Sequence, residues 1–178
     1  MAFAAFTANL RRLVEHASRK NGGKPVILVT HSKGGLMVAE FLTRNATPWR
    51  RRFVKHLVMV STGAGGIVVP MRSLAASAAP RVPMTAVYSA GLPTPEQLVY
   101  WDGDFSKAPE VVYGDGDGAV YLVSVLAWNT VVGDDPEQGF FKAVKIMNAT
   151  HSGIITDEFA LKRVISEILE ANRATYDK

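Results

Sequence analysis

Residues 25–42, PVILVTHSKGGLMVAEFL, join an uninterrupted apolar run to a short polar turn and then to a helical pattern. The run from Pro25 to Thr30 is rich in β-branched residues, which is typical of a strand buried on both faces of a parallel sheet. The segment from Leu36 to Asn45 is predicted to be a helix, which Pro48 is expected to end. This order of strand, turn and helix predicts an α/β fold.

The rest of the chain repeats this alternation. Three further apolar runs are predicted as buried strands: Phe53–Val60, Met84–Tyr88 and Phe140–Met147. Helical or loop segments separate them, so we predict a parallel sheet with right-handed crossovers. Two short extended pieces between Leu98 and Val120, on either side of Asp102-Gly103-Asp104, predict a hairpin that leaves the sheet.

Amphipathic helices are predicted near both ends of the chain. The first ends at Asn21-Gly22-Gly23, and its apolar face contains Phe3, Phe6, Leu10, Leu13, Val14 and Ala17. The second extends from Asp157 to Asn172, and its apolar stripe contains Phe159, Leu161, Val164, Ile165 and Ile168. Because core-packing helices commonly have this pattern, we interpret the first helix as packing on the core rather than on a membrane.

The composition is that of one globular domain, which we expect to extend over residues 1–178. Of the 178 residues, 48% are hydrophobic and 20% are charged, which excludes a disordered or low-complexity chain. The net charge of +4 is dispersed and predicts no nucleic-acid partner. The absence of cysteine excludes disulfides, cysteine-ligated metals and a thiol nucleophile, and we expect no metal or cofactor. No apolar run approaches the ~20 residues that span a bilayer.

The turn Thr30-His31-Ser32-Lys33-Gly34-Gly35 resembles the nucleophile elbow, G-x-S-x-G, of α/β-hydrolases. In such a turn the serine hydroxyl stands above the sheet, and small residues two before and two after it let strand and helix approach closely. Gly34 fills the second of these places, whereas Thr30 stands where glycine is usual. Serine is also a common N-cap, so an ordinary helix start remains the alternative.

A serine nucleophile needs a base within hydrogen-bond reach. The chain has four histidines. His16 lies on the first predicted helix, His31 is next to the serine and His56 is inside a predicted strand, and we interpret these three as structural. His151 follows the strand that ends at Met147, at the carboxyl edge of the sheet, where ligands bind in this fold class. His151 is therefore the predicted base.

The block YGDGDGAV, Tyr113 to Val120, contains the predicted acid and lies between the serine and the histidine in sequence. The order Ser, Asp, His is that of α/β-hydrolases. Between the two aspartates we choose Asp117, because its D-x-x-V spacing matches the acid turn of these enzymes. Asp115 is expected to accept backbone hydrogen bonds that hold the turn.

Other interpretations of this block are weaker. An EF-hand loop would need acidic ligands where Tyr113 and Ser124 stand. As a dinucleotide fingerprint, the block would set two carboxylates against an anionic pyrophosphate. A plain acidic turn remains the alternative.

Four blocks occur in the order found in one known family: Val26–Gly35; Tyr88-Ser89-Ala90-Gly91 with Pro95-Glu96 and Tyr100; Tyr113–Val120; and Ala149–Ile155. They resemble the lecithin:cholesterol acyltransferase family, and most of all its plant acyltransferase-like and phospholipase branch. In such enzymes a serine takes an acyl group from a glycerolipid and passes it to water or to a lipid hydroxyl. The resemblance implies that Ser32 is the nucleophile, Asp117 the acid and His151 the base, with the Lys33 backbone N–H as one oxyanion donor. It also suggests a secretory, vacuolar or membrane-associated setting.

Two departures from the family pattern are expected to matter. The family's chains are longer, and this one begins at the helix before the nucleophile strand, so the loop that gives the second oxyanion donor has no counterpart. We therefore expect a partial α/β-hydrolase fold, a C-terminal core fragment with reduced turnover, whose Val26–Thr30 strand is an open edge that recruits further copies of the chain. Ser61–Pro83 is also much shorter than the family's lid and lipid-binding insertion.

Two functions remain open. The first is serine-dependent acyl transfer or hydrolysis on glycerolipids, with contact to a membrane surface. Trp49, Arg50-Arg51-Arg52 and Lys55 could touch anionic headgroups, although a solvated loop is the preferred interpretation of this run. The second is a non-catalytic α/β-hydrolase-like fragment that binds a lipid or a protein.

Overall fold

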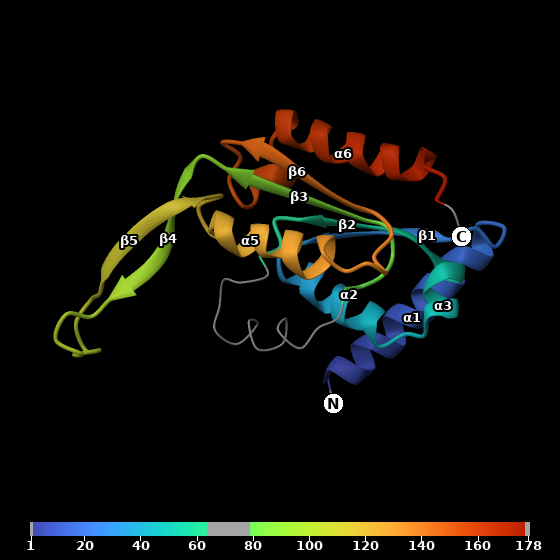
Figure 1. The fold of residues 1–178 in the computed structure, drawn as a ribbon, viewed down its shortest axis with the longest axis horizontal. Coiled ribbons are helices and arrows are strands. Elements are labelled where there is room, and N and C mark those ends of the chain that lie inside the picture. Colours follow the sequence, from blue (N-terminus) through green and yellow to red (C-terminus); the bar gives the residue numbers. More distant parts are fainter. Residues whose placement is uncertain (1, 64–78, 177–178) are drawn as a thin grey trace.

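The structure is a computed structural model, and it describes residues 2–63 and 79–176. Four parallel strands form the central sheet in the order β1-β2-β3-β6 (Figure 1). Their bounds are Val26–His31 for β1, Val54–Val60 for β2, Met84–Ala90 for β3 and Phe141–Met147 for β6. These are the four strands that the sequence predicts, and their parallel arrangement is confirmed.

Helices cover both faces of this sheet, so the molecule has three layers (Figure 1). One face carries α1 (Ala2–Lys20), α2 (Lys33–Thr43), α3 (Thr47–Phe53) and α5 (Leu122–Trp128). The other face carries α6 (Glu158–Arg173). A π-helical turn, η1 (Asn129–Gly133), follows α5, and a 3-10 turn, η2 (Gly153–Ile155), precedes α6.

The two cores explain why the strand sequences are continuously apolar. Along β2, Leu57 and Met59 point into the core beneath α2 and α5, whereas Val58 and Val60 point into the core beneath α6. Successive side chains of a strand point to opposite faces, so a strand covered on both sides has no polar alternation.

The strand β1 stands at the end of the sheet and, within the described residues, pairs only with β2. All residues of β1 except Val29 are partly buried, and the Val29 side chain is exposed. The sequence-based expectation of an edge at Val26–Thr30 therefore agrees with the observed order of strands.

The predicted hairpin exists, but its predicted bounds are wrong. It consists of β4 (Leu92–Val99) and β5 (Glu110–Gly116), which pair antiparallel in a separate sheet, and it begins directly after β3 rather than at Leu98. The sequence did not indicate β4 because the strand contains Pro93 and Pro95, and proline is disfavoured in central strands. A strand with a single neighbour can accommodate proline, since it need not donate hydrogen bonds on both sides.

The segment around Trp49 is a helix, α3, and not the predicted loop. Pro48 lies in its first turn, where the missing N–H costs nothing, so proline starts a helix here after ending the previous one. Arg50 is buried, and its guanidinium donates to the carbonyls of Leu42 at 3.3 Å and Pro80 at 3.0 Å. Arg50 is thus a structural link within the fold and is not available for lipid headgroups.

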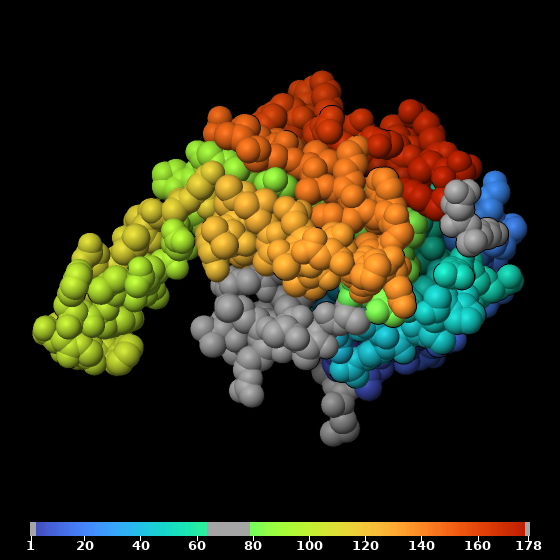
Figure 2. Space-filling model, in the orientation of Figure 1, coloured from blue at the N-terminus to red at the C-terminus, as the bar shows by residue number. Residues whose placement is uncertain are grey.

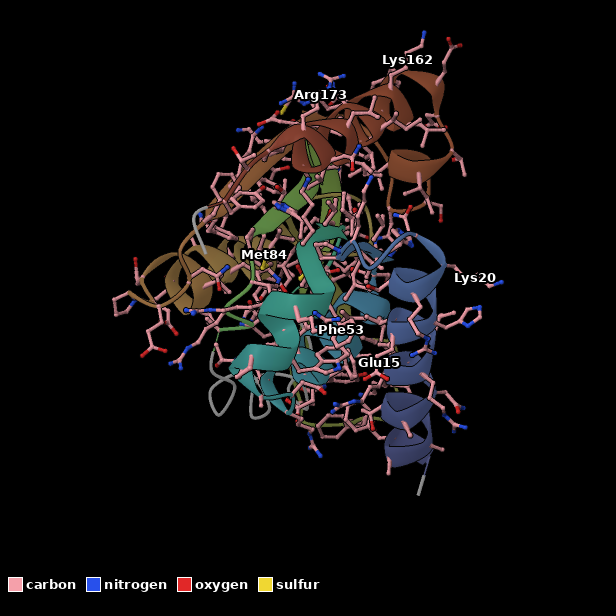
Figure 3. All side chains as sticks on the ribbon, turned by 90° about the vertical axis from the view of Figure 1, so that its right-hand side faces the viewer. Glu15, Lys20, Phe53, Met84, Lys162 and Arg173 are labelled. Atoms are coloured by element: carbon pink, nitrogen blue, oxygen red, sulfur yellow. The ribbon has the colours of Figure 1, made fainter. Side chains whose placement is uncertain are left out.

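A hydrogen bond joins α1 to α3. The Trp49 indole N–H donates to the Glu15 carboxylate at 2.8 Å, and Figure 3 shows Glu15 on the side of α1 that faces α3, with Lys20 pointing away from it.

The predicted apolar faces of the terminal helices are broader than the observed contacts. Leu13 of α1 is exposed, as are Phe159 and Ile165 of α6.

The buried polar cluster beneath the end of the chain involves His56. Its Nε2 lies 2.8 Å from the Thr85 hydroxyl and its Nδ1 lies 2.7 Å from the Tyr176 hydroxyl. The side chain is 1% exposed. Both partners are hydroxyls that can donate or accept, so a neutral imidazole satisfies the cluster in either tautomer. Burial lowers the pKa of His56 from 6.5 to about 4.

We expect this cluster to make stability depend on pH in the acidic range. Below pH 6.5 the unfolded chain protonates His56, whereas the folded chain keeps it neutral until about pH 4, so stability is present above 6.5 and is lost as the pH falls through this window. The loss should reach about 3 kcal/mol. Urea unfolding between pH 7 and pH 4 measures it, and His56→Gln should have a flatter profile than the parent chain. Parallel profiles for the two proteins would contradict the assignment.

Candidate active site

Ser32 sits in a constrained turn between β1 and α2. Its backbone has φ 54° and ψ −134°, and residues other than glycine rarely adopt such a positive φ. Its N–H donates to the Val60 carbonyl at 2.9 Å, and its own carbonyl accepts from the Thr62 hydroxyl at 2.9 Å. The turn therefore has the sharp strand-to-helix geometry of a nucleophile elbow, which directs the serine hydroxyl over the carboxyl edge of the sheet.

The two glycines after Ser32 differ in how closely their surroundings approach. A Cβ at Gly34 would lie 4.0 Å from the Thr30 Cβ, which is an ordinary contact. A Cβ at Gly35 would collide with Thr62 and would lie 2.8 Å from the Met59 Cε. Thr30 and residue 34 are therefore far enough apart that threonine is tolerated where glycine is usual, even without a glycine at 34. The close approach between helix and strand, which sequence reasoning attributed to Gly34, depends on Gly35.

The His151 ring bridges Ser32 and Asp117. Its Nε2 lies 2.9 Å from the Ser32 hydroxyl oxygen, and its Nδ1 lies 2.9 Å from the Asp117 carboxylate. The carboxylate only accepts, so in the neutral ring Nδ1 carries the proton and Nε2 accepts from the serine hydroxyl. The structure thus brings together the three residues predicted from the sequence, although they are far apart along the chain.

The Asp117 carboxylate is fixed at both oxygens. One oxygen accepts from the backbone N–H groups of Ala119 at 3.0 Å and Val120 at 2.7 Å, and the other faces His151. The residue is 2% exposed. The bond from the Val120 N–H, three residues after Asp117, is a physical reason for the D-x-x-V spacing. With its remaining oxygen aimed at the imidazole, Asp117 is held in the orientation that an orienting acid needs.

Asp115 has a different environment. It is exposed and accepts from the Gly91 N–H at 2.5 Å, which ties the end of β5 to the turn after β3. This contact is the backbone-holding type that the sequence predicts for Asp115.

His31 has a contact that sequence reasoning did not find. Its Nε2 lies 2.8 Å from the His151 carbonyl oxygen, and the two imidazole rings are 4.8 Å apart. Since a carbonyl only accepts, Nε2 of His31 donates this bond. His31 is structural, as predicted, but what it holds is the loop of the candidate base. The other two histidines lie elsewhere, His16 exposed on α1 and His56 buried within β2.

Lys33 is the first residue of α2. The first N–H groups of a helix have no intrahelical acceptor, so the Lys33 N–H belongs to the set that can receive an anion beside Ser32. Among residues 2–63 and 79–176, no group of three or more acidic or histidine side chains could hold a metal ion. In the same residues, no helix is long and apolar enough to cross a membrane.

Comparison with solved structures defines the class of the fold. The crystal structure of an alpha/beta hydrolase enzyme from the sediment metagenome of the lagoon of Mar Chica, Morocco, matches with a TM-score of 0.51 at 11% identity, covering 94% of this chain and 71% of that chain. This likeness confirms the predicted α/β-hydrolase fold.

Sequence comparison shows which family the chain resembles. The model of the family described as Lecithin:cholesterol acyltransferase matches residues 3–78. Lecithin-cholesterol acyltransferase-like 1 of Oryza sativa subsp. japonica is 30% identical over 247 residues, which cover 93% of this chain and 56% of the relative. Human lysosomal phospholipase A and acyltransferase is 32% identical over 75 residues, covering 42% of this chain and 18% of that protein. Similarity to the lecithin:cholesterol acyltransferase family thus extends over most of the chain, as the sequence motifs predicted.

The chain spans about half the length of the curated plant relatives that it matches. It is also shorter within the matched region. The rice alignment has 247 positions, whereas 93% of 178 residues is about 166, so about 80 positions of the relative face gaps in this chain. The predicted shortened lid, Ser61–Pro83, lies mostly outside the described residues, which exclude 64–78.

The two glycines provide a matched test of the elbow. Gly35→Ala should destabilise the fold by about 1–3 kcal/mol, because the added methyl group overpacks against Thr62 and Met59. Gly34→Ala should be neutral or stabilising by up to about 1 kcal/mol, since it meets only ordinary contact and alanine favours helix. Chemical denaturation of the two variants measures the difference. Equal stabilities would show that the approach at Gly35 is not the constraint described above.

Proposed function

We propose that the chain catalyses acyl transfer or hydrolysis on glycerolipids through an acyl-Ser32 intermediate. The single observation that carries the proposal is the continuous hydrogen-bonded chain from the Ser32 hydroxyl through His151 to Asp117. A serine hydroxyl acquires nucleophilic reactivity when a base takes its proton, and that base needs a fixed tautomer.

In the first half of the reaction, the Ser32 oxygen attacks the ester carbonyl carbon as its proton moves to Nε2 of His151. Asp117 stabilises the resulting imidazolium, and the Lys33 N–H donates to the carbonyl oxygen as it becomes negatively charged. The tetrahedral intermediate then collapses with cleavage of the ester C–O bond. The leaving alcohol takes the proton from His151, and the acyl group remains on Ser32.

In the second half, an acceptor hydroxyl replaces the lipid alcohol. It gives its proton to His151 as its oxygen attacks the acyl carbon, and collapse returns that proton to Ser32. Water as the acceptor releases a fatty acid, whereas a lipid hydroxyl forms a new ester. The same three side chains serve both outcomes, so the choice of acceptor depends on what reaches the acyl group.

The names of the relatives support a lipid substrate. The family is described as an acyltransferase family, and the human relative is named as both a phospholipase and an acyltransferase. The alternative is a non-catalytic fragment that keeps the fold and binds a lipid or a protein. Only the catalytic proposal requires a reactive Ser32, so covalent labelling by a fluorophosphonate separates the two.

We expect the fluorophosphonate to label the chain on Ser32 alone, and Ser32→Ala to abolish labelling. Asp117→Asn should slow labelling and ester turnover by up to ~10⁴, because the amide no longer holds the imidazole in its productive tautomer. Asp115→Asn is the matched control: it removes a carboxylate two residues away that faces Gly91 instead of His151, and should cost less than about tenfold. A folded Asp115→Asn protein without labelling, beside an active Asp117→Asn protein, would reverse the assignment.

We also propose that the open β1 edge joins copies of the chain. Edge strands present unpaired backbone groups that can pair with another strand, and the exposed Val29 lies on this one. The partner is a second copy, because the same edge on two molecules can pair symmetrically.

Light scattering at several concentrations tests this edge. The parent chain should associate as its concentration rises, and Val29→Lys should weaken association by about tenfold or more, since an edge lysine opposes strand pairing. Leu13→Lys is the control, because Leu13 is an exposed apolar residue on α1. Association that Leu13→Lys weakens as much as Val29→Lys would contradict pairing through β1.

A further inference from the structure

The hairpin β4–β5 is an arm that projects from the body of the molecule (Figures 1 and 2). We define the arm as residues 92–116. Its base is anchored, since Thr94 is fully buried and its hydroxyl accepts from the Gly118 N–H at 2.8 Å. Beyond this base most residues of both strands are exposed. The distal part of the arm is therefore surrounded by solvent on both faces.

This solvated arm carries large apolar side chains. Trp101 and Phe105, in the connection between the two strands, are each 78% exposed. Tyr113 is 60% exposed and Leu98 is 57% exposed. Clustered apolar exposure of this kind commonly marks an interaction surface.

The tip of the arm holds its aromatic side chains in a defined arrangement. The Trp101 indole N–H donates to the Glu110 carboxylate at 2.8 Å across the hairpin. The rings of Tyr100 and Phe105 lie 4.6 Å apart, and Asp104 accepts from the Ser106 N–H at 3.0 Å. The Trp101 indole thus has its polar N–H bound at one end and exposed apolar surface at the other, which is the character of side chains that reside at a membrane–water interface.

The arm leaves the sheet at the edge that carries the candidate active site. Its last residue, Gly116, precedes Asp117, and Leu92 forms a bridge with Asp117. Further exposed apolar residues are Met147, which ends β6, and Val123, Ile155 and Phe159, which lie in the segments that follow β5 and β6. Exposed apolar side chains are therefore present both on the arm and on the segments near Asp117 and His151.

The charge of the arm determines which kind of lipid surface it can approach. It contains five acidic residues and one basic residue: Glu96, Asp102, Asp104, Glu110, Asp115 and Lys107. This excess of negative charge repels anionic headgroups, so electrostatic attraction to an acidic membrane cannot drive contact at this site. A neutral, zwitterionic surface imposes no such penalty. A narrow convex tip also matches a fluid interface, which deforms around it, better than a preformed protein pocket.

We propose that the tip of the arm, with Leu98, Trp101 and Phe105, inserts into the interface of a zwitterionic phosphatidylcholine bilayer and holds the candidate active site at the lipid surface. The second part of this inference rests on the proposed function, because only an enzyme acting on lipids needs its Ser32 at that surface. The first part, insertion of the tip, can be measured without any catalysis.

Tryptophan fluorescence reports on the tip selectively. The chain has three tryptophans, and Trp49 and Trp128 are buried whereas Trp101 is exposed. In the Ser32→Ala protein, phosphatidylcholine vesicles should shift the emission to shorter wavelength as Trp101 leaves water. Adding anionic phosphatidylglycerol to the vesicles should not enlarge this shift. Absence of a shift with phosphatidylcholine, or a shift that requires the anionic lipid, would overturn the proposal.

Vesicle sedimentation tests the residues of the tip. Trp101→Ala/Phe105→Ala should weaken partitioning onto phosphatidylcholine by about tenfold or more, because it removes the two most exposed aromatic rings. The matched control, Ile165→Ala/Leu169→Ala, removes exposed apolar side chains from α6 and should change partitioning by less than about twofold. Equal losses in the two double variants would overturn insertion through the tip.

Hydrolysis of a water-soluble short-chain ester separates this inference from the proposed function. The tip variant should hydrolyse it at the rate of the parent chain, since the hydrogen bonds that link Ser32, His151 and Asp117 do not involve Trp101 or Phe105. A chain that inserts Trp101 into vesicles but leaves the ester intact would refute the proposed function and retain the membrane surface. A chain that hydrolyses the ester without inserting Trp101 would refute the membrane surface alone.

Discussion

The contact between Asp117 and His151 is the interaction on which the candidate site depends. It has two points: the His151 backbone N–H donates to the Asp117 carbonyl at 2.9 Å, and the His151 imidazole meets the Asp117 carboxylate at 2.9 Å. The backbone bond fixes where the base loop lies, and the side-chain bond fixes how the ring is oriented. Because Asp117 is buried, its charge is costly without these partners. The same contact therefore orients the His151 imidazole and stabilises the buried Asp117 carboxylate.

This clamp also determines where the arm goes. The acid turn that it holds is the end of β5, so fixing Asp117 against His151 fixes the base of the hairpin relative to the sheet. Asp115 adds a second tie to Gly91, at the other end of the hairpin base. The two aspartates therefore have different partners: Asp117 binds the His151 imidazole, and Asp115 binds the backbone at the start of the hairpin. Movement of the arm would act on the candidate site through these two residues.

The sequence predicts those features that depend on local pattern. Strands covered on both faces appear as continuous apolar runs, and Ser32, Asp117 and His151 could be chosen because each follows an extended segment at the same edge. Features that depend on tertiary contacts were not predictable. The need for Gly35 arises from Thr62, a residue of another segment, and the contact of His31 arises from the position of the His151 carbonyl. Two predictions were wrong at prolines: Pro93 lies in a strand that was not predicted, and Pro48 lies in the first turn of a helix where a loop was predicted.

The open edge and the candidate site share the strand β1, yet the restraints on Ser32 come from the opposite side of that strand. Its N–H is bound to Val60 at the end of β2, and its carbonyl is bound to Thr62. Thr62 is held in turn by the Trp128 indole N–H, which donates to its carbonyl at 2.8 Å. The elbow is therefore supported by β2 and α5, and leaving the other edge of β1 unpaired removes none of these bonds. Pairing of that edge with a second copy can then change the oligomeric state without changing the orientation of the serine.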